Sequence, residues 1–225
     1  MQAREDDARR RRSIAFAGVD LDTHGSDFAK HLIDLAQQHM TDDAWLTRSR
    51  KRFTLVEMAQ AARRTDGDSG GSGGRRHERL SDATKIAMGL ANEYLVGRFL
   101  AAKHKERYDH SCWVSRYRSQ VATDGAGDDA LGFDFRVRTL EVEWRYEVKS
   151  SLEYICEFEF PANEMRVAAE CAANTTRRYR ILYVPFVFDP TRWRVMELPN
   201  PMTEAGRKLF RVVGSGATRY RFEPR

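Results

Sequence analysis

Two neighbouring segments between Gly132 and Ser151 carry charged side chains at alternate positions. The first contains Asp134, and the second contains Glu147 and Lys149. Because successive side chains of a β-strand point to opposite faces, Glu147 and Lys149 share a face if this segment is a strand. Antiparallel pairing about a centre between residues 140 and 141 sets Asp134 across from Glu147, with their Cβ atoms within about 5 Å. The sequence therefore predicts two adjacent carboxylates with an ammonium group beside them.

These side chains have the chemistry of a metal-dependent hydrolytic site. Like charges directly opposite on a sheet are unfavourable, so a cation between them is expected. Mg²⁺ binds one or two carboxylates and leaves its other positions to water and phosphate, and Mn²⁺ is the second candidate. A metal-bound water beside a lysine is suited to phosphodiester hydrolysis. The competing interpretation is a solvated strand face of mixed charge, which includes Arg136 and Arg145.

Helices are predicted on both sides of this hairpin. Ser81 or Asp82 can cap a helix with an apolar stripe that ends near His104. Glu93 lies in the middle of this helix and borders the stripe, so it is either an inward-pointing site residue or an exposed side chain. A further helix is expected from Asn163 through Ala172.

Three further segments have the composition of strands. Residues 111–115 are expected to be extended, residues 179–188 form an apolar run typical of a strand buried on both faces, and residues 192–198 add a short strand. The order helix, three strands, helix, strand, strand predicts an α/β or α+β fold, with a central mixed sheet flanked by helices.

The first third of the chain has a different composition. Residues 26–40, capped by Ser26, and residues 54–62 are predicted to be short amphipathic helices of an N-terminal extension over 1–64. Residues 65–82 are rich in Gly and Ser, which predicts a flexible linker, and 83–225 form the main domain. The extension has too few apolar residues for a secure core, so we expect its helices to dock on a partner protein or a second copy of the chain.

The ordered set of residues resembles a known family. It comprises Glu93 in a helix, Trp113, Gly132-Phe-Asp134, Glu147-Val-Lys149-Ser150 and Phe160-Pro-Ala-Asn163-Glu164. The resemblance is to the NO VEIN C-terminal domain, a domain of unknown function in the PD-(D/E)XK, restriction-endonuclease-like superfamily, and it covers about residues 85 to 200.

The resemblance implies a restriction-endonuclease-like core and a role for each matching residue. Asp134 and Glu147 would hold the divalent metal, Lys149 would assist the attacking water, and Glu93 would complete or orient the site. Asn163 and Glu164 match an element whose role in the family is less defined, and are expected to be accessory.

Clustered basic residues suggest a polyanionic partner. The formal net charge is +5 and the isoelectric point is about 9.2. Arginines next to tyrosines can bind phosphates and stack on unpaired bases, although solvated helix ends explain any single cluster equally well. The candidate nucleic-acid-binding residues are Arg116, Arg118, Arg177, Arg178 and Arg180.

Composition excludes some classes of protein. The chain is 41% hydrophobic, and no apolar run approaches the roughly 20 residues of a transmembrane helix, so no membrane association is expected. Three cysteines without metal-ligand spacing, together with a start that does not read as a secretory signal, favour a cytoplasmic protein. A phosphate-binding GxxxxGK[ST] loop is also absent from the sequence.

The sequence therefore predicts a nuclease that acts on DNA with Mg²⁺ or Mn²⁺, and the effector of a bacterial defence or restriction assembly is one setting for such an activity. Two alternatives stay open at this point. One is a non-catalytic nucleic-acid-binding or scaffolding module that retains the fold, and the other is a nuclease directed at RNA.

Overall fold

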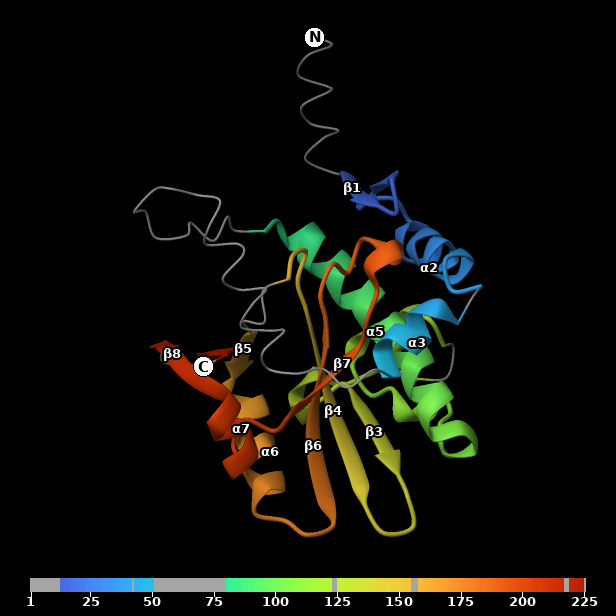
Figure 1. Cartoon of the computed structure of the whole chain (residues 1–225). Coiled ribbons are helices and arrows are strands. Elements are labelled where there is room, and N and C mark those ends of the chain that lie inside the picture. The colour runs from blue at the N-terminus through green and yellow to red at the C-terminus, as the bar shows by residue number, and fades with distance from the viewer. Residues whose placement is uncertain are drawn as a thin grey trace.

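A four-stranded mixed sheet lies at the centre of the protein. The computed structural model describes residues 13–41, 43–50, 80–122, 125–154, 158–216 and 219–224. The strands run in the order β3-β4-β6-β7, with β3 antiparallel to β4, β4 parallel to β6, and β6 antiparallel to β7 (Figure 1). Their bounds are Phe135–Arg138, Glu143–Ser150, Arg177–Val184 and Met196–Pro199. This mixed sheet with flanking helices confirms the predicted α+β class.

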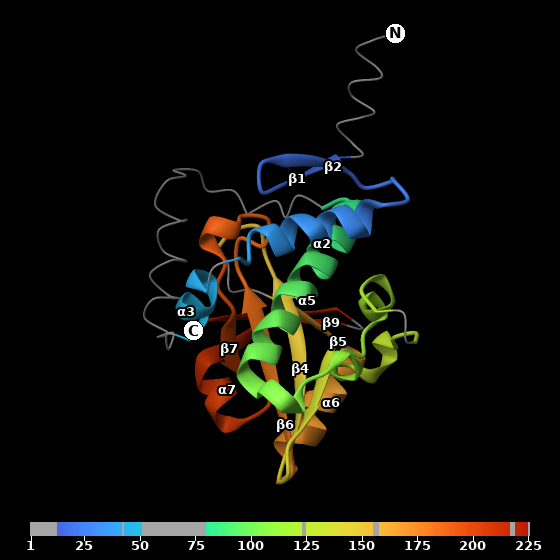
Figure 2. The same ribbon diagram turned by 90° about the vertical axis from the view of Figure 1, so that its right-hand side faces the viewer.

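The long helix α5 (Asp82–His104) covers one face of the sheet (Figure 2). It begins after Ser81, whose Oγ accepts a hydrogen bond of 3.1 Å from the Thr84 backbone N–H, as an N-cap residue does. Its apolar side chains share one core with Tyr146 and Val148 of β4. Both predicted ends of this helix are confirmed.

Helix α6 (Ala162–Ala172) covers the opposite face and lies in the crossover that joins the parallel strands β4 and β6. On β6, Ile181 and Tyr183 pack on the α6 side, whereas Leu182 and Val184 pack on the α5 side. A strand buried on both faces has no polar face, which explains the apolar run in the sequence. The last predicted strand begins only at Met196, because the residues before it include the short 3₁₀ helix η5 (Pro190–Arg192).

A second, three-stranded sheet has the order β5-β9-β8. Its strands are Phe158–Pro161, Arg219–Pro224 and Phe210–Gly216, and all its pairings are antiparallel. Helix α7 (Glu204–Leu209) precedes β8 and is capped by Thr203, whose Oγ1 accepts from the Gly206 N–H at 3.2 Å. The sequence reasoning did not identify β8, β9 or α7.

The N-terminal segment packs into the main core, which corrects the prediction of a helical extension outside it. It contains a hairpin, β1 (Ser13–Phe16) and β2 (Val19–Asp22), followed by α2 (Phe28–Gln38) and α3 (Ala44–Arg50). Phe16, Leu32 and Trp45 are buried in the same core as α5. Hydrogen bonds add to this packing, since Arg48 Nε donates to the Trp193 carbonyl at 3.0 Å.

Three predictions about this region have different outcomes. Asp27, not Ser26, occupies the N-cap of α2, and its side chain makes no capping hydrogen bond. The helix predicted at 54–62 and the linker up to residue 79 lie outside the described residues, while Asp82 is already the first residue of α5.

The connection between α5 and β3 consists of short 3₁₀ helices: η1 (Lys105–Arg107), η2 (His110–Cys112), η3 (Arg116–Gln120) and η4 (Asp129–Leu131). The strand predicted at 111–115 is therefore wrong, apart from a single bridge between Trp113 and Phe135. Asp109 favours the turn, because its Oδ1 accepts from the Ser111 backbone N–H at 2.7 Å. Within the described residues, no helix is both long enough and apolar enough to cross a membrane.

Candidate functional site

The hairpin of β3 and β4 has the predicted register. Phe135 pairs with Tyr146, as predicted. The regular ladder ends at this pair, because the Asp134 N–H donates to the Tyr146 carbonyl at 2.8 Å, and Asp134 lies close enough to Glu147 for the charge of Glu147 to act on it. Asp134 Oδ2 in turn accepts from the Val148 N–H at 2.8 Å. The carboxylate is thus fixed at the edge of the sheet by the backbone of the neighbouring strand.

Alternation of faces along the first strand of the hairpin begins only at Asp134. Phe135 is buried on the α5 side, but Phe133 packs in the core on the α6 side, with the Arg145 guanidinium 5.0 Å from its ring centroid. Gly132, just before this break, has a φ of +75°, in the left-handed region that favours glycine. A side chain there would also collide with the Asn163 carbonyl oxygen, at 2.8 Å.

Lys149 joins two carboxylates on the α6 side of the sheet. Its Nζ lies 2.8 Å from Glu147 Oε1 and 2.7 Å from Glu164 Oε2, and all three side chains are mostly buried. Burial tends to lower the pKa of Lys149, but the charges of Glu147 and Glu164 outweigh it and raise this pKa above its usual value. Lys149 therefore stays protonated, and Glu164, which sequence reasoning left without a definite role, is its partner from α6.

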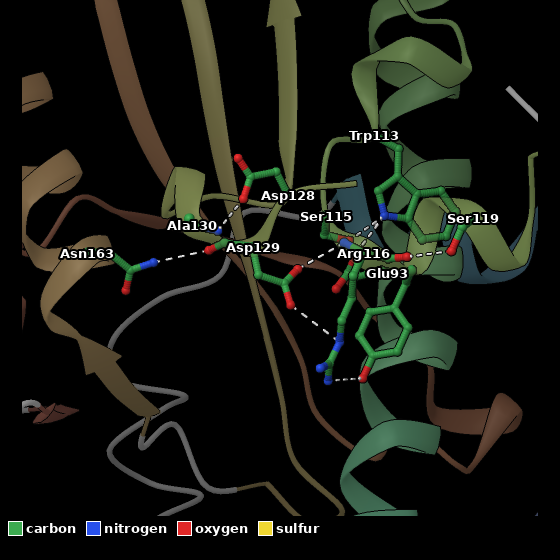
Figure 3. A network of polar contacts seen from close by, with 10 residues as sticks. Glu93, Trp113, Ser115, Arg116, Ser119, Asp128, Asp129, Ala130 and Asn163 are labelled. Carbon is green, nitrogen blue, oxygen red and sulfur yellow. Dashed lines mark hydrogen bonds and ion pairs between the residues drawn. The ribbon is translucent and has the colours of Figure 1, made fainter. Parts of the chain in front are cut away.

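Glu93 reaches the same region from α5 and is 6% exposed. Its Oε2 accepts a hydrogen bond of 2.6 Å from Trp113 Nε1 and another from the Ser115 hydroxyl, and Figure 3 shows this group. Burial raises the pKa of Glu93 to about 8, although both hydrogen bonds act in the opposite direction. The inward orientation is thus correct, and the solvated alternative is excluded for this residue.

The cluster has more carboxyl groups than its own cation can balance if all of them ionise. Burial raises the pKa of Asp134 well above its usual value, and the charges of Glu147 and Glu93 add to this shift. Burial, followed by the charge of Glu147, also raises the pKa of Glu164 to about 8. Lys149 contacts two of the four carboxylates, whereas Asp134 and Glu93 accept hydrogen bonds from neutral groups. A buried excess of negative charge is the environment that a cation stabilises.

The donor set fits a hard divalent cation at two residues. Asp134 and Glu147 supply neighbouring carboxylates, and Mg²⁺ or Mn²⁺ commonly takes one or two carboxylates together with water. Over the described ranges, however, no three Asp, Glu, His or Cys side chains converge on one ion position. The predicted set of Asp134, Glu147 and Glu93 is therefore not assembled as three direct ligands, because Glu93 is held by Trp113 and Ser115.

The rim beside Glu93 contains Arg116 and Asn163, two of the predicted site residues. Arg116 Nε lies 3.3 Å from Asp129 Oδ2, and its backbone N–H donates to Asp129 Oδ1 at 2.9 Å. Asn163 Nδ2 donates to the Asp129 carbonyl at 3.1 Å, which ties η4 to α6 (Figure 3). Asn163 is thus a structural link, and Arg116 is an exposed cation at the edge of the acidic cluster. Arg118 lies in the same 3₁₀ helix, half-buried.

The arginines of β6 lie farther away and on two different faces. Arg177 alternates toward the α6 side, whereas Arg178 and Arg180 alternate toward the α5 side. Arg178 Nη1 donates to the Asn174 carbonyl at 2.8 Å, and the Arg180 guanidinium lies 5.7 Å from the Trp144 ring centroid. These three residues pair with the start of β4, so they lie roughly 10–20 Å along the sheet from Lys149. They do not form one cluster with Arg116.

Sequence reasoning missed the residues that hold Glu93. Trp113 is 3% exposed and packs in the core, and its indole N–H is also the donor to Glu93. Ser115 had no sequence signal beyond its position two residues after Trp113. No protein-family model matches the chain, and neither a curated protein nor a solved structure shows significant similarity to it.

Proposed function

We propose that this protein is a metal-dependent nuclease that hydrolyses phosphodiester bonds of DNA. The observation that carries the proposal is the pair of neighbouring carboxyl groups of Asp134 and Glu147, beside a protonated Lys149 in a cluster with more carboxyl groups than cations. Asp134 and Glu147 would hold Mg²⁺ or Mn²⁺. The ion would polarise the phosphate and lower the pKa of bound water.

Lys149 acts in this proposal as an electrostatic and positioning group. Because Glu147 and Glu164 keep it protonated, it cannot accept a proton from water near neutral pH. It can instead donate hydrogen bonds to phosphate oxygens, where negative charge develops during cleavage. Glu164 orients the ammonium group from α6, and Asp134 is oriented by the Val148 N–H.

Glu93 is a positioning residue in this scheme. Its bonds to Trp113 and Ser115 hold it on the α5 side of the cluster, and its charge acts on Asp134 through space. The net charge of +5 and the exposed Arg116 favour a polyanionic substrate over a neutral one. A restriction-endonuclease-like core, as implied by the resemblance, agrees with this assignment of residues.

A second candidate function is favoured by one observation. Lys149 is already paired with two carboxylates, and three direct metal ligands are not assembled within the described residues. That arrangement also suits a nucleic-acid-binding module that retains the fold but does not cut.

Cleavage and metal binding distinguish the two. Supercoiled plasmid and a matched RNA are incubated with the full chain in Mg²⁺, Mn²⁺, Ca²⁺ or chelator, and metal affinity is measured separately by calorimetry. We expect DNA cleavage in Mg²⁺ or Mn²⁺, lost in Glu147→Gln but kept in Glu170→Gln, an exposed carboxylate of α6. Metal binding to the wild type that is unchanged in Glu147→Gln would exclude the proposed site. Cleavage of RNA alone would assign the enzyme to RNA.

A further inference from the structure

A cavity of about 290 Å³ lies against α5 and is lined in part by Trp113. Tyr94, Tyr108 and Trp113 contribute aromatic surface to its wall. Its volume is at the lower end of the range for sites that bind small organic ligands, about 300–1,000 Å³. Gly97 also lines it, and a Cβ atom there would come within 3.0 Å of the Tyr108 hydroxyl. The cavity therefore combines a small volume with aromatic side chains in its lining, which suits a planar ring.

The polar residues of the cavity are suited to a ligand with both a negative charge and N–H groups. Arg98 and His110 can contact an anion, and Asp109 supplies a hydrogen-bond acceptor. Arg98 is exposed, and it makes no ion pair with any residue that the structure describes. A cation beside stacked aromatic surface is the combination by which proteins bind single-stranded nucleic acid.

Trp113 connects this cavity with the candidate active site. One side of the residue lines the cavity, while its Nε1 donates to Glu93 Oε2 at 2.6 Å. Gly97 lies one turn after Glu93 on α5, which corresponds to about 6 Å along the helix axis. A nucleic-acid strand bound at the acidic cluster could therefore place a neighbouring nucleotide in the cavity.

We propose that this cavity binds one unpaired nucleotide of the substrate, with the base against the half-buried Tyr108 and a phosphate on the exposed Arg98. The proposal rests on the nucleic-acid-directed function proposed above. It narrows the substrate to nucleic acid that is single-stranded, or has an unpaired nucleotide, next to the bond that is cut. Bases held in a duplex cannot reach a narrow cavity without leaving the stack.

The test measures binding in chelator, so that cleavage does not interfere. A fluorescein-labelled single-stranded oligonucleotide and the matched duplex are titrated with the full chain, and affinity is read by anisotropy. Arg98→Ala removes the cation and Val121→Phe fills the cavity from a half-buried lining position. Arg166→Ala is the matched control, because it removes one exposed positive charge on α6. Thermal unfolding of each variant checks that the fold is retained.

We expect Arg98→Ala and Val121→Phe each to weaken single-strand binding about tenfold or more, which is the scale of one lost base-stacking contact. Duplex binding should change no more than it does in Arg166→Ala. Single-strand affinity that is unchanged in Val121→Phe, or equal losses for Arg98→Ala and Arg166→Ala, would overturn the cavity proposal. That result leaves the nuclease proposal intact if the wild type still binds and cuts duplex. A wild type that neither binds nor cuts either probe would refute both.

Discussion

Replacing Asp134 by Asn should abolish metal-dependent cleavage and stabilise the metal-free protein. The half-buried carboxyl group lies within range of the charge of Glu147, and Asp134 Oδ2 accepts one hydrogen bond from the Val148 N–H at 2.8 Å. An amide oxygen can still accept that hydrogen bond, but it carries no charge. Asp134→Asn therefore separates the electrostatic role of the residue from its role at the sheet edge.

The structure sets the sign and size of the effect. Burial and the charge of Glu147 disfavour the ionised form of Asp134 in the folded protein, and each unit by which its pKa is raised corresponds to about 1.4 kcal/mol, so an uncharged amide should raise the melting temperature at neutral pH by a few degrees. Asp134→Ala removes the same charge but also leaves the buried Val148 N–H without its acceptor, which costs about 1–3 kcal/mol. The alanine variant should therefore melt several degrees below the asparagine variant.

The stabilisation should also depend on pH. Burial, and then the charges of Glu147 and Glu93, raise the pKa of Asp134 in the folded protein. Between the usual pKa of an aspartate and this raised value, the unfolded chain ionises while the folded one keeps its proton, so stability falls as pH rises. The asparagine side chain does not ionise, so the stability advantage of Asp134→Asn over the wild type should disappear in acid.

Thermal unfolding followed by circular dichroism in chelator, from pH 4 to pH 8, measures these differences, and plasmid cleavage in Mg²⁺ gives the activity. Metal chemistry contributes several kcal/mol to catalysis, so the loss of rate should be at least about hundredfold. An asparagine variant that is less stable than the wild type at neutral pH, or that melts together with Asp134→Ala, would refute the electrostatic reasoning. A variant that cuts at the wild-type rate would refute the site.

Three further predictions concern the neighbours of Asp134. Glu93 has a folded pKa of about 8 against 4.5 for the free group, so the stability of the metal-free protein should fall by an amount on the order of a few kcal/mol between about pH 4.5 and about 8. Glu93→Gln should flatten this dependence in the same melting experiment, and an unchanged slope would contradict the assignment. Lys149→Met leaves Glu147 and Glu164 without their cation and should lower the free energy of unfolding by about 3–5 kcal/mol, measured with denaturant at neutral pH. Adding Glu164→Gln should restore part of this stability. Additive losses of stability would show that Lys149 and Glu164 do not interact. Trp113→Phe removes a hydrogen-bond donor to Glu93 and should destabilise the protein by about 1–3 kcal/mol. It should also shift the titration of Glu93 to higher pH. A titration that does not move would mean that the indole N–H does not lower the pKa of Glu93.

The elements around the site could be predicted because local sequence determines them. The register of the hairpin follows from the alternation around Glu147 and from the tight turn, where the Thr139 N–H donates to the Val142 carbonyl at 2.9 Å. Helix α5 follows from the Ser81 cap and an apolar stripe at helical spacing. The charged face of β4 and the doubly buried β6 follow in the same way from period and composition. The pair Asp134 and Glu147 is thus a property of a short stretch of chain.

Other features depended on packing between distant segments. Trp113 binds Glu93 across 20 residues, and Glu164 reaches Lys149 from a helix that begins after another strand. The N-terminal hairpin and α2 read as a separate extension, yet Phe16 and Leu32 complete the core on α5. The periodicity of a sequence does not indicate which apolar face packs against which element, because this depends on the shapes and burial of the side chains once the sheet has formed. For the same reason, the sequence alone could identify the carboxylates of the site. It could not show that hydrogen bonds hold Glu93, or that Lys149 pairs with both Glu147 and Glu164.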